Sequence, residues 1–149
     1  KGRKKVCMRI MALDIGEVRT GVAVSDPGER VASPVVVLPS AEVRACAKSF
    51  KRVLENWEPE LFVCGLPYTM TGEEGPQAKR IRAYAADVSH ATGIPVEFSD
   101  ERLSSQEAKR SLREKGLSEK KMRGKVDKIA ASIFLQSWLD ARMREQEQQ

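Results

Sequence analysis

The sequence has little histidine and cysteine and no long apolar run, and each shortage excludes a class of protein. It contains one histidine, His90, and three widely spaced cysteines, Cys7, Cys46 and Cys64, with no CxxC pair. This usage favours free thiols in a reducing compartment over a disulfide framework or a zinc site. No apolar run approaches the roughly 20 residues that span a bilayer, and KGRKK at the start is followed by only a brief apolar stretch. We therefore expect a cytoplasmic protein without a signal peptide or a membrane partner, whose chemistry uses no pair of histidines.

Length and charge indicate one soluble domain with an anionic partner. The chain has 149 residues, of which 41% are hydrophobic and 32% charged, and this balance predicts a single domain over residues 1–149. Residues 1–8 and 143–149 are expected to be loosely ordered. The net charge is +5, and between positions 109 and 128 nine Lys and Arg residues face three acids. Such a basic stretch is typical of proteins that bind nucleic acid, although it can also be a solvated surface.

The segment from Arg9 to Asp26 organises the rest of the chain. Two apolar runs, 10–13 and 21–24, flank a polar turn and predict a hairpin of two short strands. The first run ends at Asp14, and aspartate is rare in strands and costly to bury without a partner. Asp14 is therefore either a charge placed at the sheet edge for function or an acceptor for the amides of the 17–21 turn.

The remaining elements predict an α/β domain. A third strand over 31–38 contains Pro34, so it should lie at a sheet edge or carry a bulge. One amphipathic helix is expected from the Ser40 N-cap to Glu58, and a buried strand over 61–64. A helix beginning near Pro76 ends at Gly93, and a strand follows over 94–98. Ser104 and Glu107 have the spacing of a capping box and predict a helix to about residue 115. We expect residues 116–124 to form a basic loop. The last helix is expected to run from residue 125 past residue 140.

Three acidic positions can meet on this scaffold. Asp14 ends the first strand, Asp100 and Glu101 end the last, and parallel strands open at the same sheet edge. Asp127 lies near the start of the last helix, where the helix dipole alone would favour an acid. However, Ala130, Ala131, Phe134 and Trp138 follow it by three, four, seven and eleven residues, which places Asp127 on the apolar side of that helix.

Converging carboxylates repel one another unless cations lie between them. Oxygen ligands favour Mg²⁺ or Mn²⁺, and a pair of such ions can activate water and stabilise attack at phosphorus without histidine. The pattern therefore predicts a two-metal phosphodiesterase site.

The chain resembles the YqgF family, also called RuvX, in four segments that occur in order, DIGEVRTGVAVSD, GLPYTMTGEEGPQAKR, PVEFSDERLSSQEA and VDKIAASIFLQSWLD. The resemblance implies a ribonuclease H-like α/β/α fold with a mixed five-stranded sheet of order 3-2-1-4-5, in which strand 2 is antiparallel. It also implies a metal-dependent nuclease, either a Holliday junction resolvase or a nuclease that matures the 5′ end of pre-16S rRNA. In that case Asp14, the DER segment and Asp127 supply the catalytic acids.

One departure affects the second acid. Resolvase-type relatives usually carry an acid at the end of the fourth strand, where this chain has Gly65, Leu66 and Pro67. The second metal ligand should then come from the fifth strand. Alternation permits one of Asp100 and Glu101 to face the ions. We favour Glu101, because its longer side chain can cross the additional strand.

Several residues are candidates for binding the nucleic-acid backbone. They are Arg19 in the hairpin turn and the basic residues Lys120, Lys121, Arg123 and Lys125. The loop YTMTGEEGPQ, with Gly72 and Gly75 ahead of a helix, is a candidate phosphate-binding loop, although such glycines also suit any tight connection.

Three functions are weighed at the level of sequence, and the first is our prediction. It is a nuclease acting on pre-rRNA, with branched DNA, cleaved by a symmetric homodimer, as the alternative substrate. The second is a non-catalytic nucleic-acid-binding factor in ribosome assembly. The third is an actin-like nucleotide hydrolase, which needs two such domains where this chain has room for one.

Overall fold

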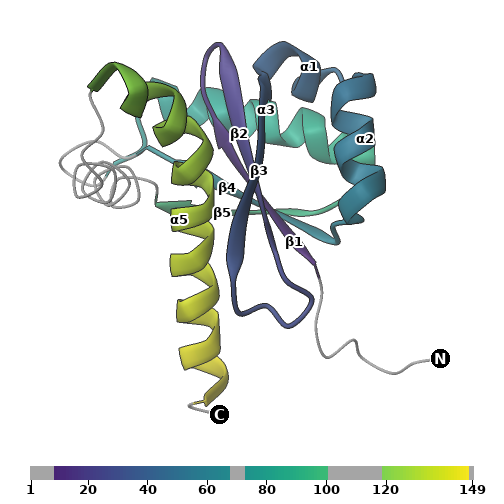
Figure 1. The fold of residues 1–149 in the computed structure, drawn as a ribbon. Coiled ribbons are helices and arrows are strands. Elements are labelled where there is room, and N and C mark those ends of the chain that lie inside the picture. Colours follow the sequence, from purple (N-terminus) through teal and green to yellow (C-terminus); the bar gives the residue numbers. More distant parts are fainter. Residues whose placement is uncertain (1–8, 68–72, 101–118, 148–149) are drawn as a thin grey trace.

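Five strands form one mixed sheet at the centre of the computed structural model (Figure 1). The model describes residues 9–67, 73–100 and 119–147, with the backbone alone for residues 100, 119–128 and 146–147. The sheet order is β3-β2-β1-β4-β5, which confirms the predicted topology. Its strands are β1 (Ile10–Ile15), β2 (Arg19–Ser25), β3 (Ala32–Pro39), β4 (Leu61–Leu66) and β5 (Val96–Asp100).

The first three strands form the predicted antiparallel meander. The turn between β1 and β2 is tight at Gly16, where an added Cβ would lie 2.6 Å from the carbonyl oxygen of Arg19, so only glycine fits there. β3 is an edge strand, and its pairing with β2 shifts register where Val22 pairs with Val36 but Ala23 pairs with Pro34. Pro34 thus has both features expected of a strand proline, an edge position and an adjacent bulge.

Each face of the sheet buries its own hydrophobic cluster. On one face Met11, Leu13 and Ile15 pack with helices α1 (Ser40–Arg44), α2 (Lys48–Trp57) and α3 (Pro76–Thr92). On the other face Ile10 and Ala12 pack against α5 (Glu119–Glu147). Figure 1 shows α5 beside the sheet, opposite the other helices. This three-layer arrangement follows from the strict alternation of buried side chains along β1.

The single helix expected over 40–58 is wrong, because two helices occupy this segment. Cys46 adopts a left-handed conformation with φ of 52°, and the amide of Ala47 donates to the carbonyl of Glu42 at 2.9 Å. This bond closes α1 and directs the chain into α2. The apolar spacing of Val43 and Phe50 continues across the break, and both are fully buried, so periodicity alone does not reveal it.

The last helix begins earlier than predicted. We expected a loop over 116–124 and a helix from 125, whereas α5 is helical from Glu119 and includes Gly124. A glycine inside a helix costs about 1 kcal/mol, which the packing of residues from Ala130 onward can offset. α5 also continues to Glu147, so residues 143–147, expected to be loosely ordered, are helical. The helix expected over 104–115 lies outside the described residues.

Candidate active site

Asp14 lies near the carboxyl end of the central strand, on the sheet face that α5 covers. Its neighbours along β1 with the same parity, Ile10 and Ala12, belong to the α5-side cluster, whereas Leu13 and Ile15 face the other helices. The Asp14 side chain is partly buried. On this face of β1, the apolar residue Ala12 is therefore followed two residues later by the charged residue Asp14, close to the end of the strand.

The strand positions on both sides of Asp14 are glycines. In β2 its partner is Gly21. In β4, Leu13 pairs with Cys64, so the next residue of β4, Gly65, lies beside Asp14. Neither glycine projects a side chain over the α5 face. The Asp14 carboxylate is thus flanked by glycine backbone on two sides.

The second acidic candidate lies at the same edge of the sheet, one strand beyond β4. β5 is parallel to β4 and ends at Asp100, which pairs with Leu66. Two earlier residues of β5, Val96 and Phe98, pack on the cluster facing α3. The side chain of Asp100 and the whole of residue 101 lie outside the described part, so the choice between Asp100 and Glu101 stays a prediction.

The third candidate, Asp127, belongs to α5. Three and four residues later, Ala130 and Ala131 are buried, and Phe134 and Leu135 pack on the sheet one turn further. The Asp127 backbone therefore belongs to the helix that covers the Asp14 face. Its side chain is outside the described part. Among the described side chains, no group of three His, Cys, Asp or Glu residues could hold a metal ion.

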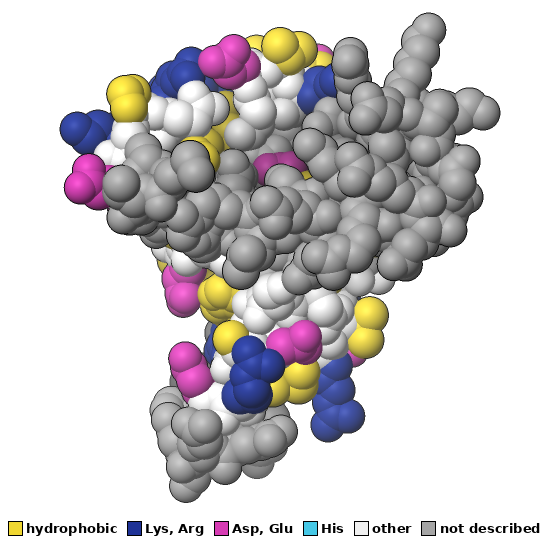
Figure 2. Space-filling model, turned by 90° about the vertical axis from the view of Figure 1, so that its left-hand side faces the viewer, with side chains coloured by type: hydrophobic (Ala, Val, Ile, Leu, Met, Phe, Trp, Pro, Cys, Tyr) yellow, Lys and Arg dark blue, Asp and Glu magenta, His cyan; other side chains and the backbone are white. Residues whose placement is uncertain are grey.

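The predicted nucleic-acid contacts are placed unevenly. Arg19 is exposed at the first residue of β2, beside the hairpin turn. Lys120, Lys121, Arg123 and Lys125 belong to the first turns of α5, with their side chains outside the description. Where side chains are described on the face seen in Figure 2, acidic, basic and hydrophobic groups are interspersed. The prediction of backbone binding therefore depends on the first turns of α5.

The candidate phosphate loop is described only at its end. Gly72 is outside the described residues, and Gly75 immediately precedes α3 with an extended backbone. Beside it, both carboxylate oxygens of Glu74 accept from Arg82 at 2.7 Å, and this pairing lowers the pKa of Glu74. An ion-paired acid next to the helix start does not favour phosphate binding at this loop.

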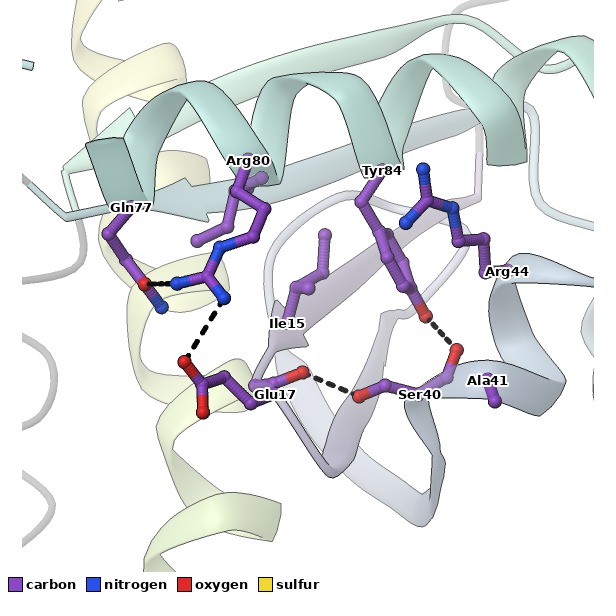
Figure 3. Close-up of a pocket in the computed structure, with 10 residues that line it drawn as sticks. Ile15, Glu17, Ser40, Ala41, Arg44, Gln77, Arg80 and Tyr84 are labelled. Carbon is purple, nitrogen blue, oxygen red and sulfur yellow. Dashed lines mark hydrogen bonds and ion pairs between the residues drawn. The ribbon is translucent and has the colours of Figure 1, made fainter. Parts of the chain in front are cut away.

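A pocket that the sequence did not reveal lies at the same sheet edge, on the α3 face (Figure 3). It has a volume of about 430 Å³ and is formed by the β1–β2 turn, α1 and α3. Its charged lining residues are Glu17, Arg44 and Arg80. Glu17 and Arg80 are 63 positions apart, and no periodicity in the sequence connects them.

Buried hydroxyl groups fix the walls of this pocket. The Tyr84 hydroxyl donates to the carbonyl of Ser40 at 2.6 Å, and the Ser40 hydroxyl donates to the carbonyl of Gly16 at 2.6 Å. Thr20 Oγ1 lies 2.9 Å from Ser40 Oγ. Burial raises the pKa of Tyr84, so its phenol stays protonated and can keep donating. These bonds join α1 and α3 to the β1–β2 turn.

Sequence comparison places the chain among known proteins over most of its length. A family model described as "RuvX: Holliday junction resolvase" matches residues 8–141. A protein of Anaeromyxobacter sp. (strain Fw109-5) named "Putative pre-16S rRNA nuclease" is 44% identical over 135 residues, which cover 91% of this chain and 98% of that protein. A protein of the same name from Chloroflexus aurantiacus is 42% identical over 133 residues, covering 89% of this chain and 87% of the relative.

Solved structures with the same fold include two resolvases. Thermus thermophilus RuvC, solved in complex with a Holliday junction substrate, aligns with a TM-score of 0.55 at 16% identity, covering 91% of this chain and 96% of RuvC. Fowlpox virus resolvase, also solved with Holliday junction DNA, gives a TM-score of 0.52 at 16% identity, covering 90% of this chain and 98% of that one. These alignments confirm the predicted ribonuclease H-like fold.

Among the described helices, none has the length and apolar character to cross a membrane.

Proposed function

Because the chain belongs to the RuvX family, we propose that it is a divalent-metal-dependent nuclease that hydrolyses phosphodiester bonds in structured nucleic acid, namely at the 5′ end of pre-16S rRNA. The observation that carries the proposal is the position of Asp14, a carboxylate between two glycines on the face covered by α5. The proposed ligands of the ions are Asp14, Glu101 and Asp127.

Hydrogen bonds of Gln136 show which part of α5 lies beside the beginning of β1. The distance of Asp127 along the helix can be counted from there. Gln136 accepts from the amide of Ala32 at 2.9 Å and donates to the carbonyl of Arg30 at 2.7 Å. Ala32 pairs with Ser25, whose hydroxyl accepts from the amide of Ile10 at 3.0 Å. Gln136 is therefore level with the beginning of β1.

The distance from Ile10 to Asp14 along β1 is about the same as the distance from Gln136 to Asp127 along α5. Asp14 follows Ile10 by four residues, which is about 13 Å in a strand. Asp127 precedes Gln136 by nine residues, which is about 13 Å in a helix. α5 and β1 run in opposite directions in Figure 1. The backbones of Asp14 and Asp127 thus come to the same end of the sheet, and this supports their joint role.

The chemistry of the donor set fits Mg²⁺ or Mn²⁺. Asp14 offers hard oxygen ligands, while the described thiols lie elsewhere, Cys64 on the α3 face and Cys46 between α1 and α2. Burial raises the pKa of Cys64, so it is a neutral thiol. When bound, the ions would supply an activated water and stabilise in-line attack at phosphorus.

The parity of β5 favours Glu101 over Asp100 as the second ligand. Val96 and Phe98 contribute to the cluster on the α3 face, opposite the face of Asp14. Asp100 shares their parity in the sequence and Glu101 does not. We therefore propose Glu101 as the second ligand, with Asp100 as the alternative.

Substitution of Asp14 tests the nuclease function. The purified protein is incubated with a precursor 16S rRNA fragment and with a four-way DNA junction, in Mg²⁺, Mn²⁺ or EDTA. We expect cleavage of the rRNA precursor with either metal, none in EDTA, and none by Asp14→Asn, which should retain the fold and nucleic-acid affinity. Unchanged cleavage by a clean Asp14→Asn preparation would overturn the proposal.

The family description favours a second candidate, cleavage of four-way DNA. A resolvase of this kind would act as a symmetric homodimer that places two sites on two strands. Preferential cleavage of the junction, with a dimeric mass in solution, would select this function. Salt-dependent binding with no cleavage under any divalent ion would instead indicate a non-catalytic assembly factor in the cytoplasm.

A further inference from the structure

We propose that the pocket between the β1–β2 turn, α1 and α3 binds a single unpaired nucleotide of the substrate strand adjacent to the scissile phosphate, with Arg80 contacting the phosphate of that nucleotide. The identity of the ligand rests on the proposed nuclease function. The residues involved are separate from the proposed metal ligands, so the two proposals can fail independently.

The position of the pocket connects it to the candidate active site. Ile15 lines the pocket and is the next residue after Asp14. Successive strand residues face opposite sides of a sheet, so Asp14 belongs to the α5 face and Ile15 to the α3 face. The two sites are therefore separated only by the edge of the sheet, where β1 ends. A nucleic-acid strand passing over this edge would reach both.

The size and lining of the pocket suit one nucleotide. Its volume of about 430 Å³ falls within the range of small-ligand sites, roughly 300–1,000 Å³. Ile15, Ile81 and Tyr84 form the apolar part of its lining, against which a base or ribose can pack. Gln77, Arg80 and Glu17 provide polar groups at its opening (Figure 3). A double helix would not enter such a pocket, whereas an unpaired nucleotide can.

Arg80 is already bound to a carboxylate that a phosphate can replace. Its Nη1 lies 3.1 Å from Oε1 of Glu17, and the two side chains are 58% and 68% exposed. An ion pair this exposed contributes little to stability, so exchanging its acid costs little. A phosphate offers more acceptor oxygens to the planar guanidinium than Glu17 offers here. Glu17 therefore competes with the substrate for Arg80.

Arg44 supplies a second guanidinium group on the opposite wall, in another exposed ion pair. Its Nη2 lies 2.6 Å from Oδ2 of Asp87, and its guanidinium carbon is 5.6 Å from the centre of the Tyr84 ring. Figure 3 shows Arg44 and Arg80 on either side of Tyr84. Two guanidinium groups from different helices thus flank an apolar floor, a combination that favours an anionic ligand with a flat ring.

The test measures binding in EDTA, where cleavage does not contribute. A fluorescein-labelled single-stranded hexaribonucleotide is titrated with wild type, Arg80→Gln, Glu17→Gln and Lys79→Gln. We expect Arg80→Gln to weaken binding about 10-fold and Glu17→Gln to strengthen it, because its competing carboxylate is gone. Lys79 is exposed on the same helix and does not line the pocket, so Lys79→Gln should change binding little.

Three results would overturn the proposal. They are equal weakening by Arg80→Gln and Lys79→Gln, no effect of Arg80→Gln in a variant with a wild-type melting temperature, and displacement of the RNA by inorganic phosphate as readily as by cytidine monophosphate. The last would indicate a site for free anions. If the variants show the expected binding pattern but the protein cleaves no substrate, the nuclease function is refuted and the nucleotide pocket is supported. If the protein cleaves its substrate without this binding pattern, the nuclease function is supported and the nucleotide pocket is refuted.

Discussion

Asp14 lies directly across the β1–β2 ladder from Gly21, the one residue type that projects nothing toward it. Directly paired residues of antiparallel strands have Cβ atoms about 5 Å apart, so any larger side chain at position 21 would share the space around the carboxylate. Because glycine has no side chain, position 21 adds no group beside Asp14 on the α5 face.

Replacing this glycine should therefore impair metal binding more than folding. Gly21→Val adds a residue of high strand propensity, but places two methyl groups beside the Asp14 carboxylate. We expect Mn²⁺ affinity to fall by at least about 10-fold, measured by calorimetry, with Gly21→Ala intermediate. A Gly21→Val protein with a native circular dichroism spectrum and unchanged Mn²⁺ affinity would contradict this account of the site.

The two aspartates of α5 should differ sharply in their importance for cleavage. Asp140 accepts a hydrogen bond from Gln136 at 3.1 Å, toward the end of the sheet remote from Asp14. The proposed site places Asp127 near the level of Asp14, from the rise of helix and strand. We expect Asp127→Asn to reduce Mn²⁺-supported cleavage by at least about 100-fold and Asp140→Asn to leave it within about twofold. Equal rates for the two variants would remove Asp127 from the site.

The basic residues at the start of α5 should determine the salt dependence of binding. Each phosphate contact that is lost reduces the slope of log affinity against log salt by about 1. The triple variant Lys120→Gln, Lys121→Gln, Arg123→Gln should therefore bind RNA more weakly, with a shallower slope. A control triple on α2, Lys48→Gln, Lys51→Gln, Arg52→Gln, removes the same charge elsewhere. Indistinguishable slopes for the two variants would locate the backbone contacts outside this segment.

Asp26 should contribute to stability only above acidic pH. Its Oδ1 accepts the amides of Val31 at 3.0 Å and Arg30 at 2.7 Å, and these bonds lower its pKa below 3.8. A carboxyl group whose pKa is lowered by folding stabilises the native state above its unfolded pKa, and this contribution is lost as the pH falls through the folded pKa. The melting temperature of wild type should exceed that of Asp26→Asn by a constant amount from pH 5 to 7, with a difference that shrinks below about pH 4. A difference independent of pH would contradict this assignment.

The strands were predictable because their information is local in the sequence, and the order of the sheet was implied by the resemblance to the YqgF family. The apolar run that precedes Asp14, a proline within β3 and a glycine after α3 each act on their own strand or helix. Once the strands are identified, the hairpin and the parallel crossovers leave few topologies. That Asp127 belongs to the last helix followed in the same way, from the apolar spacing of Ala130 and Phe134.

The features that were missed depend on contacts that no local pattern encodes. The break at Cys46 is made by one left-handed residue within a continuous apolar spacing. The early start of α5 depends on packing further along the helix, which overrides the weak propensity of Gly124. The pocket of Glu17 and Arg80 depends on tertiary contact between the hairpin turn and α3, so only the structure reveals it.

The central claim is that divalent ions bind at Asp14, and Mn²⁺ binding in the absence of nucleic acid tests it most directly. Free and bound Mn²⁺ are distinguished by electron paramagnetic resonance for wild type, Asp14→Asn and the control Asp26→Asn, an equivalent loss of charge at the opposite end of the hairpin. We predict that wild type and Asp26→Asn bind Mn²⁺ equally and that Asp14→Asn does not bind it. Wild-type affinity in a correctly folded Asp14→Asn protein would contradict the account.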